Sequence, residues 1–462
     1  MPVVLGGNQL DTAAYDVSNS LRFNDNDSSA LTRTMGTPTS TRTFTYAAWL
    51  KRSNTNIQTS FLSWGGSTYA TDFRYESSTD SLYFFFDDNA GWYAKTIAKY
   101  RDVAAWYHVV LAVDTTQATE SNRVKLYVNG TQYGPALDGT DWTQHEIFGQ
   151  NYDFPELANG QTMAIGKRNS SGSHFFDGYM SEVYFIDGQA LDSSYFGETN
   201  DNGVWIPKEY SGTYGNNGFL LEFKQTGGGT DSSGRGADTS GNDNHFANNN
   251  FDTYDTTTDT PTNNFATLNP LSNSLQASYQ EGNLEETCND NFGCGATQSF
   301  ANGKWYWEVK VTAGDYNLPG VANSDEQYRF PDTFAINNYS ITYYGLNGVI
   351  YKEGSTNQTT GTTFGANDII GLAVDMDSGT RTVQFYKNGS TVGSAVTLPT
   401  NWIYTVPMIR KGGSSQTTQF NFGNPPFSIS SGNSDANGYG NFEYAVPSGY
   451  YALCTKNLAE FG

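Results

Sequence analysis

Two segments of this chain share a strand–turn–strand pattern in which the first strand ends in Val-Asp and the second closes on Asn-Gly. One copy covers residues 106–130, and the other covers residues 369–389. A two-residue hairpin turn of the primed type needs positive φ at both central positions, which Asn and Gly tolerate best. Because each copy lies among further strand-like segments, the sequence predicts two related antiparallel β-sandwiches in tandem.

The composition indicates a folded, turn-rich β protein. Aromatic residues make up 15% of the 462 residues, whereas disordered chains contain few aromatics. Lys and Arg number 25 and Asp and Glu number 47, so the formal charge is 25 − 47 = −22. An acidic chain without a basic cluster is repelled by phosphate backbones, and we therefore expect no nucleic-acid partner.

The cysteines and the first residues indicate where the protein is made. Three cysteines (Cys288, Cys294 and Cys454) are too few for a disulfide framework, so we expect free thiols. The alternative is a Cys288–Cys294 bond formed after release into oxidising surroundings. Residues 1–7 lack the basic and apolar regions of a secretory signal, and no apolar run is long enough to cross a membrane. We expect synthesis in a cytoplasm, without membrane insertion.

Strand-like runs and changes of composition divide the chain into four parts. Residues 1–18 are predicted to form an N-terminal arm, and residues 19–225 a first sandwich. In that sandwich, alternation places Phe44, Tyr46, Ala48 and Leu50 on one face of a strand. Residues 226–279 are rich in Gly, Asn, Asp and Thr and are predicted to be a linker, because such a segment cannot bury a core. Residues 280–462 are predicted to form a second sandwich with a C-terminal tail.

Both strand series resemble known families. The first resembles the laminin-G-like, concanavalin A-like jelly rolls through Leu21-Arg22-Phe23-Asn24-Asp25-Asn26-Asp27 and through residues 44–49, 106–130 and 176–183. The second resembles the SPRY domain through residues 303–309, 370–375, 385–389 and 421–427. These resemblances imply an all-β fold of two concanavalin A-like antiparallel sandwiches.

The tandem arrangement is similar to that of proteins encoded by tailed phages. In those proteins a linker like residues 260–271 and an end like residues 451–458 recur. The similarity implies a virion protein that contacts other virion proteins and forms a homo-oligomer in the particle. This also fits a chain made without a secretory signal but composed like a surface protein, because phage particles leave the cell by lysis.

The sequence lacks the spacings typical of catalytic sites. Glycoside hydrolases with this sandwich need two carboxyl groups on one strand, and the Glu-x-Asp-x-x-Glu spacing of the laminarinase-like members does not occur. Glu285 and Glu286 are adjacent and would point to opposite faces of a strand. The four histidines show no metalloprotease spacing, and neither a nucleophile elbow nor a P-loop is present. We therefore expect no enzymatic activity and a structural role for His108.

Saccharide binding needs aromatic rings that stack on a sugar and polar groups that hydrogen-bond its hydroxyls. The candidate carbohydrate-binding residues are Asp87, Asp88, Asn89, Trp92, Tyr93 and Trp142. For Trp92, packing on the sandwich core is the alternative. In SPRY domains the inter-strand loops usually bind a protein or peptide, which implies partner-binding residues at Tyr316, Tyr328, Phe330 and Tyr339. Ordinary packing is the alternative for each of them.

Calcium is the one cofactor that the resemblance implies. Laminin-G-like domains often carry one Ca²⁺ on rim loops, bound by carboxylate and carbonyl oxygens. The candidate ligands are Asp25, Asp27, Asp231, Asp238 and Asp243. The same side chains can also cap their own turns without a metal.

Together these patterns predict a non-enzymatic virion protein, in a fibre, an appendage or a capsid attachment, that binds host surface glycan. The alternative is a purely structural module for capsid decoration or tail assembly that contacts other virion proteins.

Overall fold

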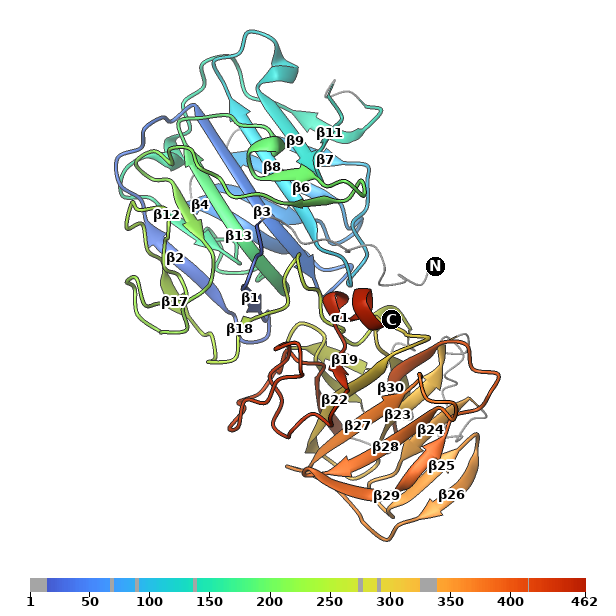
Figure 1. Cartoon of the computed structure of the whole chain (residues 1–462). Coiled ribbons are helices and arrows are strands. Elements are labelled where there is room, and N and C mark those ends of the chain that lie inside the picture. Colours follow the sequence, from blue (N-terminus) through green and yellow to red (C-terminus); the bar gives the residue numbers. More distant parts are fainter. Residues whose placement is uncertain are drawn as a thin grey trace. The chain divides into compact units, whose positions relative to one another are not determined.

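The computed structural model describes residues 15–66, 70–87, 91–135, 139–272, 277–288, 292–324, 339–413 and 415–462. These residues form two compact units, of which the first ends at Thr262 and the second begins at Asn263. Each unit is a β-sandwich (Figure 1). No helix among the described residues is long and apolar enough to cross a membrane.

The first unit consists of two antiparallel sheets and a small two-stranded one. Its strands are β1 (Ser20–Phe23), β2 (Ala30–Thr34), β3 (Thr43–Arg52), β4 (Thr59–Gly65), β5 (Ala70–Tyr75), β6 (Leu82–Asp87), β7 (Trp92–Thr96), β8 (Tyr107–Asp114), β9 (Val124–Val128), β10 (Thr131–Tyr133), β11 (Trp142–Glu146), β12 (Thr162–Ile165), β13 (Gly178–Asp187), β14 (Gly197–Thr199), β15 (Trp205–Pro207), β16 (Phe219–Leu221), β17 (Ala247–Asn249) and β18 (Thr256–Thr257). One sheet has the order β10-β9-β8-β3-β13-β1-β18, with β16 also paired to β13. The other has the order β11-β7-β6-β5-β4-β12-β2-β17, and β14 pairs with β15.

Alternation along the strands fills the core between these two sheets. Phe44, Tyr46, Ala48 and Leu50 on β3 all belong to this core, as the sequence predicts. Opposite them, β6 contributes Leu82, Phe84 and Phe86. Burial of so many large apolar side chains is the main force that holds the two sheets together.

The segment predicted as a linker is instead part of both units, and this corrects the boundaries at 226 and 279. Strand β17 pairs with β2, and β18 pairs with β1, so both extend the sheets of the first unit. Phe246 is fully buried in its core. Two ion pairs with buried partners fix the same segment, Arg22–Asp255 at 3.3 Å and Lys51–Asp259 at 2.8 Å. Polar composition misleads here because Asn, Asp and Thr side chains also satisfy the backbone of well-packed turns.

The end of the predicted linker belongs to the second unit, and the last residues of the predicted N-terminal arm pack on the first unit. Ala266 and Leu268 are buried in the core of the second unit, so that unit begins well before residue 280. Of the predicted arm, residues 1–14 lie outside the described part of the chain. Val17 is buried on the first unit, and the Tyr15 hydroxyl donates to Glu182 Oε2 at 2.8 Å.

The second unit is also a two-sheet sandwich, with a short C-terminal helix. Its elements are β19 (Ala277–Gln280), β20 (Glu285–Cys288), β21 (Phe292–Gly295), β22 (Lys304–Ala313), β23 (Asn317–Asn323), β24 (Ser340–Tyr343), β25 (Val349–Lys352), β26 (Ser355–Thr359), β27 (Ile369–Asp375), β28 (Thr382–Lys387), β29 (Ser390–Thr397), β30 (Thr405–Lys411), β31 (Gln416–Asn421), β32 (Tyr451–Ala452) and α1 (Thr455–Phe461). The sheets have the orders β19-β20-β31-β22-β27-β28-β29, with β32 parallel to β22, and β21-β30-β23-β24-β25-β26. Cys288, Cys294 and Cys454 are buried free thiols.

After β31 the chain returns across the outer face of the sheet that contains β22. Phe442 packs edge-on against Tyr306, with ring centroids 5.2 Å apart. Beside them, Glu308 accepts backbone N–H groups from Glu443 at 3.0 Å and Tyr444 at 2.8 Å. This returning segment therefore covers a sheet face that would otherwise be exposed.

Candidate functional site

The two tryptophans predicted to bind sugar are largely committed to packing. Trp142 is 1% exposed, and its indole N–H donates to the carbonyl of Gly134 at 2.9 Å. Trp142 therefore has no free ring face for a sugar, which corrects that prediction. The half-buried Trp92 ring lies 4.3 Å from Tyr152 and 6.0 Å from Phe148, centroid to centroid. It caps the core, in agreement with the alternative interpretation.

Tyr93 lies on the opposite side of its strand from Trp92 and Ala94, and faces away from the core. Two residues that the sequence analysis did not select, Tyr83 and Phe85 on β6, lie beside it. The Tyr83 ring is 5.9 Å from both the Tyr93 and the Phe85 rings. All three side chains are half-buried. We call Tyr83, Phe85 and Tyr93 the aromatic face.

Polar and charged groups border this aromatic face. The Arg74 guanidinium lies 4.4 Å from the centre of the Tyr83 ring, and the Lys95 ammonium lies 5.9 Å from it. Arg74 is held in place by the buried Asp72 carboxylate at 2.8 Å, and Asp72 also accepts the Ser60 hydroxyl at 2.5 Å. Burial raises the pKa of Tyr83, so its hydroxyl stays protonated and can donate a hydrogen bond at neutral pH.

The remaining predicted saccharide residues lie at the end of β6 and after it. Asp88 and Asn89 lie outside the described residues, and Asp87 is the last residue of β6. Their role in sugar binding stays a prediction.

Three of the five predicted calcium ligands, Asp27, Asp231 and Asp238, accept hydrogen bonds from groups of the protein itself. Asp27 accepts the Asn24 amide at 2.9 Å, and Asp231 accepts the backbone N–H of Ser233 at 2.8 Å. Asp238 accepts the backbone N–H groups of Leu220 and Asn244, both at 2.9 Å. Burial raises the pKa of Asp25, and Asp243 is exposed, 3.6 Å from His245. Among the described residues no three His, Cys, Asp or Glu side chains form a group suited to a metal, and calcium binding stays a prediction.

The predicted partner-binding residues of the second unit are only partly described. Tyr316 and Tyr339 are each 38% exposed, and Tyr316 packs 6.0 Å from the Tyr344 ring. Tyr328 and Phe330 lie outside the described residues.

His108 has the structural role that the sequence predicts. It is 1% exposed, stacks on Trp49 at 4.7 Å between ring centroids, and accepts the indole N–H of Trp205 at 3.0 Å. Burial lowers its pKa to about 3, so the ring is neutral and cannot serve as a proton donor near pH 7.

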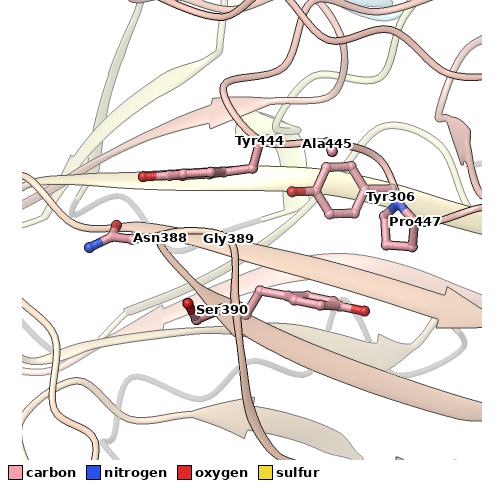
Figure 2. Close-up of a pocket in the computed structure, with 8 residues that line it drawn as sticks. Tyr306, Asn388, Gly389, Ser390, Tyr444, Ala445 and Pro447 are labelled. Atoms are coloured by element: carbon pink, nitrogen blue, oxygen red, sulfur yellow. The ribbon is translucent and has the colours of Figure 1, made fainter.

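The second unit contains a pocket lined by residues that the sequence did not predict as a site. It is a pocket of about 360 Å³ lined by Tyr306, Tyr386, Asn388, Gly389, Ser390, Tyr444, Ala445 and Pro447. Figure 2 shows Tyr444 on one side of it and the Asn388-Gly389-Ser390 turn on the other, with Tyr306 and Pro447 toward one end. These residues come from segments that are distant in sequence, so no local pattern could have identified the pocket.

Comparisons with known proteins agree with both sandwiches. Residues 24–194 match the family model of the concanavalin A-like lectin/glucanases superfamily, and residues 304–425 match that of the SPRY domain. The chain thus contains the two domain types that the sequence predicts.

Similar solved structures include the SPRY domain of human HERC1 (16% identity, 33% of this chain and 96% of that chain, TM-score 0.28). They also include the TRIM65 PSpry domain (16% identity, 34% and 91%, TM-score 0.28). A third is a SAP-like pentraxin from Limulus polyphemus (18% identity, 38% and 80%, TM-score 0.28).

Proposed function

We propose that the protein is a non-enzymatic adhesion protein of a tailed-phage virion and that its first unit binds host surface glycan. The observation that supports this most directly is the aromatic face of Tyr83, Phe85 and Tyr93. Three half-buried rings lie together on the outer side of a sheet, with the tyrosine hydroxyls and the Lys95 ammonium beside them. The buried Arg74 guanidinium lies over the Tyr83 ring and holds it in place. Rings stack on the C–H faces of a sugar, and the polar groups bond its hydroxyls.

The rigidity of the sheet favours this role. Phe85 and Tyr93 lie directly opposite each other on the paired strands β6 and β7, and Arg74 on β5 is paired with Tyr83 on β6. A site built on paired strands loses little conformational entropy on binding. Each contact is expected to be weak, and many copies on one particle would raise the overall affinity through effective concentration. We infer from this that the protein acts as a homo-oligomer in the virion.

The test is retention of the purified full chain on a glycan array and on whole host cells, with and without Ca²⁺. Alanine at Tyr83 and Tyr93 together should weaken retention roughly tenfold or more, because two stacking rings are lost. Tyr195→Ala is the matched control, since Tyr195 is a 48% exposed tyrosine of the same unit outside the aromatic face. Absence of retention by the unaltered protein, or equal retention by the double variant, contradicts the proposal.

Exposed apolar side chains of the second unit support the alternative, a structural module. Ile403 is 63% exposed, and Tyr316 and Tyr339 are each 38% exposed. Large apolar groups that gather in one exposed patch are typical of a surface that contacts another protein. Cryo-electron microscopy of the particle separates the two functions. Adhesion requires the aromatic face to point to solvent, whereas a structural module requires Ile403, Tyr316 and Tyr339 to be buried against a neighbouring virion protein.

A further inference from the structure

The pocket of the second unit is lined by several tyrosines and by no basic residue. Three of its eight lining residues are tyrosines, Tyr306, Tyr386 and Tyr444, and none is a lysine or an arginine. Tyr386 and Tyr444 are half-buried, so part of each ring reaches solvent, whereas Tyr306 is 2% exposed. The volume of about 360 Å³ admits a small molecule or a single side chain.

The amide of the pocket is already engaged within the protein. Asn388 Oδ1 accepts the backbone N–H of Ile369 at 2.9 Å, and its amide donates to Asp368 at 2.8 Å. A sugar is normally recognised by planar polar side chains that bond its hydroxyls. These bonds occupy one N–H and one oxygen lone pair of Asn388, and three of the eight lining residues are tyrosines, so the walls favour a ligand held mainly by ring faces.

A buried carboxylate lies directly behind the tyrosines. Glu308 is fully buried, and its two oxygens accept the Tyr306 hydroxyl at 3.2 Å, the Asn421 amide at 3.1 Å and the two backbone N–H groups of the returning segment. Among the residues the structure describes, no lysine or arginine pairs with it. The neighbouring Asp368 differs, because Lys387 lies 3.2 Å from it.

These observations point to a cationic guest. Tyrosine faces carry negative electrostatic potential and attract ammonium groups, most strongly when the groups are alkylated and easily desolvated. Burial raises the pKa of Glu308, while the four hydrogen bonds that its oxygens accept favour the carboxylate. As a carboxylate it extends the negative potential of the rings, since charges interact strongly where water is excluded. An anion would meet the opposite field.

We propose that this pocket binds the quaternary ammonium group of a small soluble molecule, held between Tyr386 and Tyr444 over Tyr306, with Glu308 as the fixed negative charge. The site is separate from the aromatic face of the first unit and does not depend on glycan binding.

The experiment is a calorimetric titration of the full chain with choline and with its uncharged isostere, in which carbon replaces nitrogen, at constant ionic strength. Choline should bind roughly tenfold or more tightly than the isostere, because the two have the same shape and differ in charge. Tyr386→Leu should weaken choline binding by a similar factor, whereas Tyr386→Phe should retain it. Tyr195→Leu in the first unit is the matched control and should leave the affinity unchanged.

Three results would overturn the proposal. They are equal affinity for choline and the isostere, no heat of binding with choline, and unchanged affinity in a Tyr386→Leu protein whose thermal unfolding matches that of the unaltered chain. Sedimentation of the protein with phosphatidylcholine vesicles would place the ammonium group on a lipid and overturn the assignment to a soluble molecule.

Discussion

The two Asn-Gly turns have nearly the same backbone but different coverings. Asn129 and Asn388 have φ of 47° and 48°, and Gly130 and Gly389 have φ of 81° and 77°. In each turn the Asn side chain accepts one backbone N–H from the start of the strand before the one that leads into the turn, from His108 on β8 at 2.8 Å and from Ile369 on β27 at 2.9 Å. Positive φ at both positions confirms the predicted turn type.

The two units differ in the aromatic side chain that packs over the glycine of the turn. Trp205 lies over Gly130 and is fixed by its hydrogen bond to His108, and Tyr444 lies over Gly389. The Trp205 ring seals the first turn, whereas Tyr444 lines a pocket beside the second. The same turn therefore serves as scaffold in both units, and what distinguishes them is the later segment that packs on it.

The largest expected difference between the units is their response to acid. His108 has a pKa lowered to about 3 by burial, whereas the unfolded value is near 6.5. As the pH falls from 6.5 toward 3, the unfolded state takes up the proton first, so the first unit loses stability, by about 5 kcal/mol for complete titration. The second unit has Ile369 at the matching position and lacks this contribution.

Hydrogen exchange by mass spectrometry measures this, because it reports the two units separately. His108→Gln should flatten the acid dependence of the first unit and leave that of the second unchanged. An equally steep acid dependence in the variant contradicts the assignment to His108.

The second difference concerns the segment that ends the first unit. Asp259→Ala removes the carboxylate that lies 2.8 Å from the fully buried Lys51 ammonium and should destabilise the first unit by about 4 kcal/mol, because the ammonium stays buried without that ion pair. The exposed Arg42–Asp153 pair is the control, and Asp153→Ala should cost less than about 1 kcal/mol. Urea unfolding measures both. Similar costs for the two variants would mean that residues 250–262 are not an integral part of the fold.

The smallest expected difference is in the loss of stability when each turn glycine is replaced by alanine. A Cβ at Gly130 would lie 2.3 Å from the fixed Trp205 ring, and one at Gly389 would lie 2.7 Å from the half-buried Tyr444 ring. Gly130→Ala should cost about 3 kcal/mol from strain plus overpacking, and Gly389→Ala about 1 kcal/mol, because Tyr444 can turn toward solvent. Equal costs in urea unfolding would show that the two coverings are equally rigid.

Sequence alone could predict the features that depend on local chemistry. The Asn-Gly turns, the inward face of β3 and the structural role of His108 are of this kind. Alternation along Leu82–Asp87 also contained a signal for Tyr83 and Phe85, since they occupy the positions opposite the core residues of β6. This signal is weak, because aromatic residues in strands are more often core than surface.

The features that sequence could not predict depend on long-range pairing. Trp142 is buried because it packs near Gly134, and the polar segment after residue 226 joins the sheets because β1 and β2 leave edges that it can pair with. The tyrosine pocket forms only when the returning segment reaches β22 and β28. None of these contacts has a local sequence pattern.

The most direct test of the account is hydrogen exchange of the full chain with each ligand, the saccharide retained on the array and choline. The central claim is that each unit has its own binding surface, on β5–β7 in the first unit and at the tyrosine pocket in the second. It predicts that the saccharide slows exchange in residues 70–87 and 91–96, and that choline slows exchange in residues 384–390 and 441–447. Slowed exchange of the same residues by both ligands, or saccharide protection confined to the second unit, would contradict it.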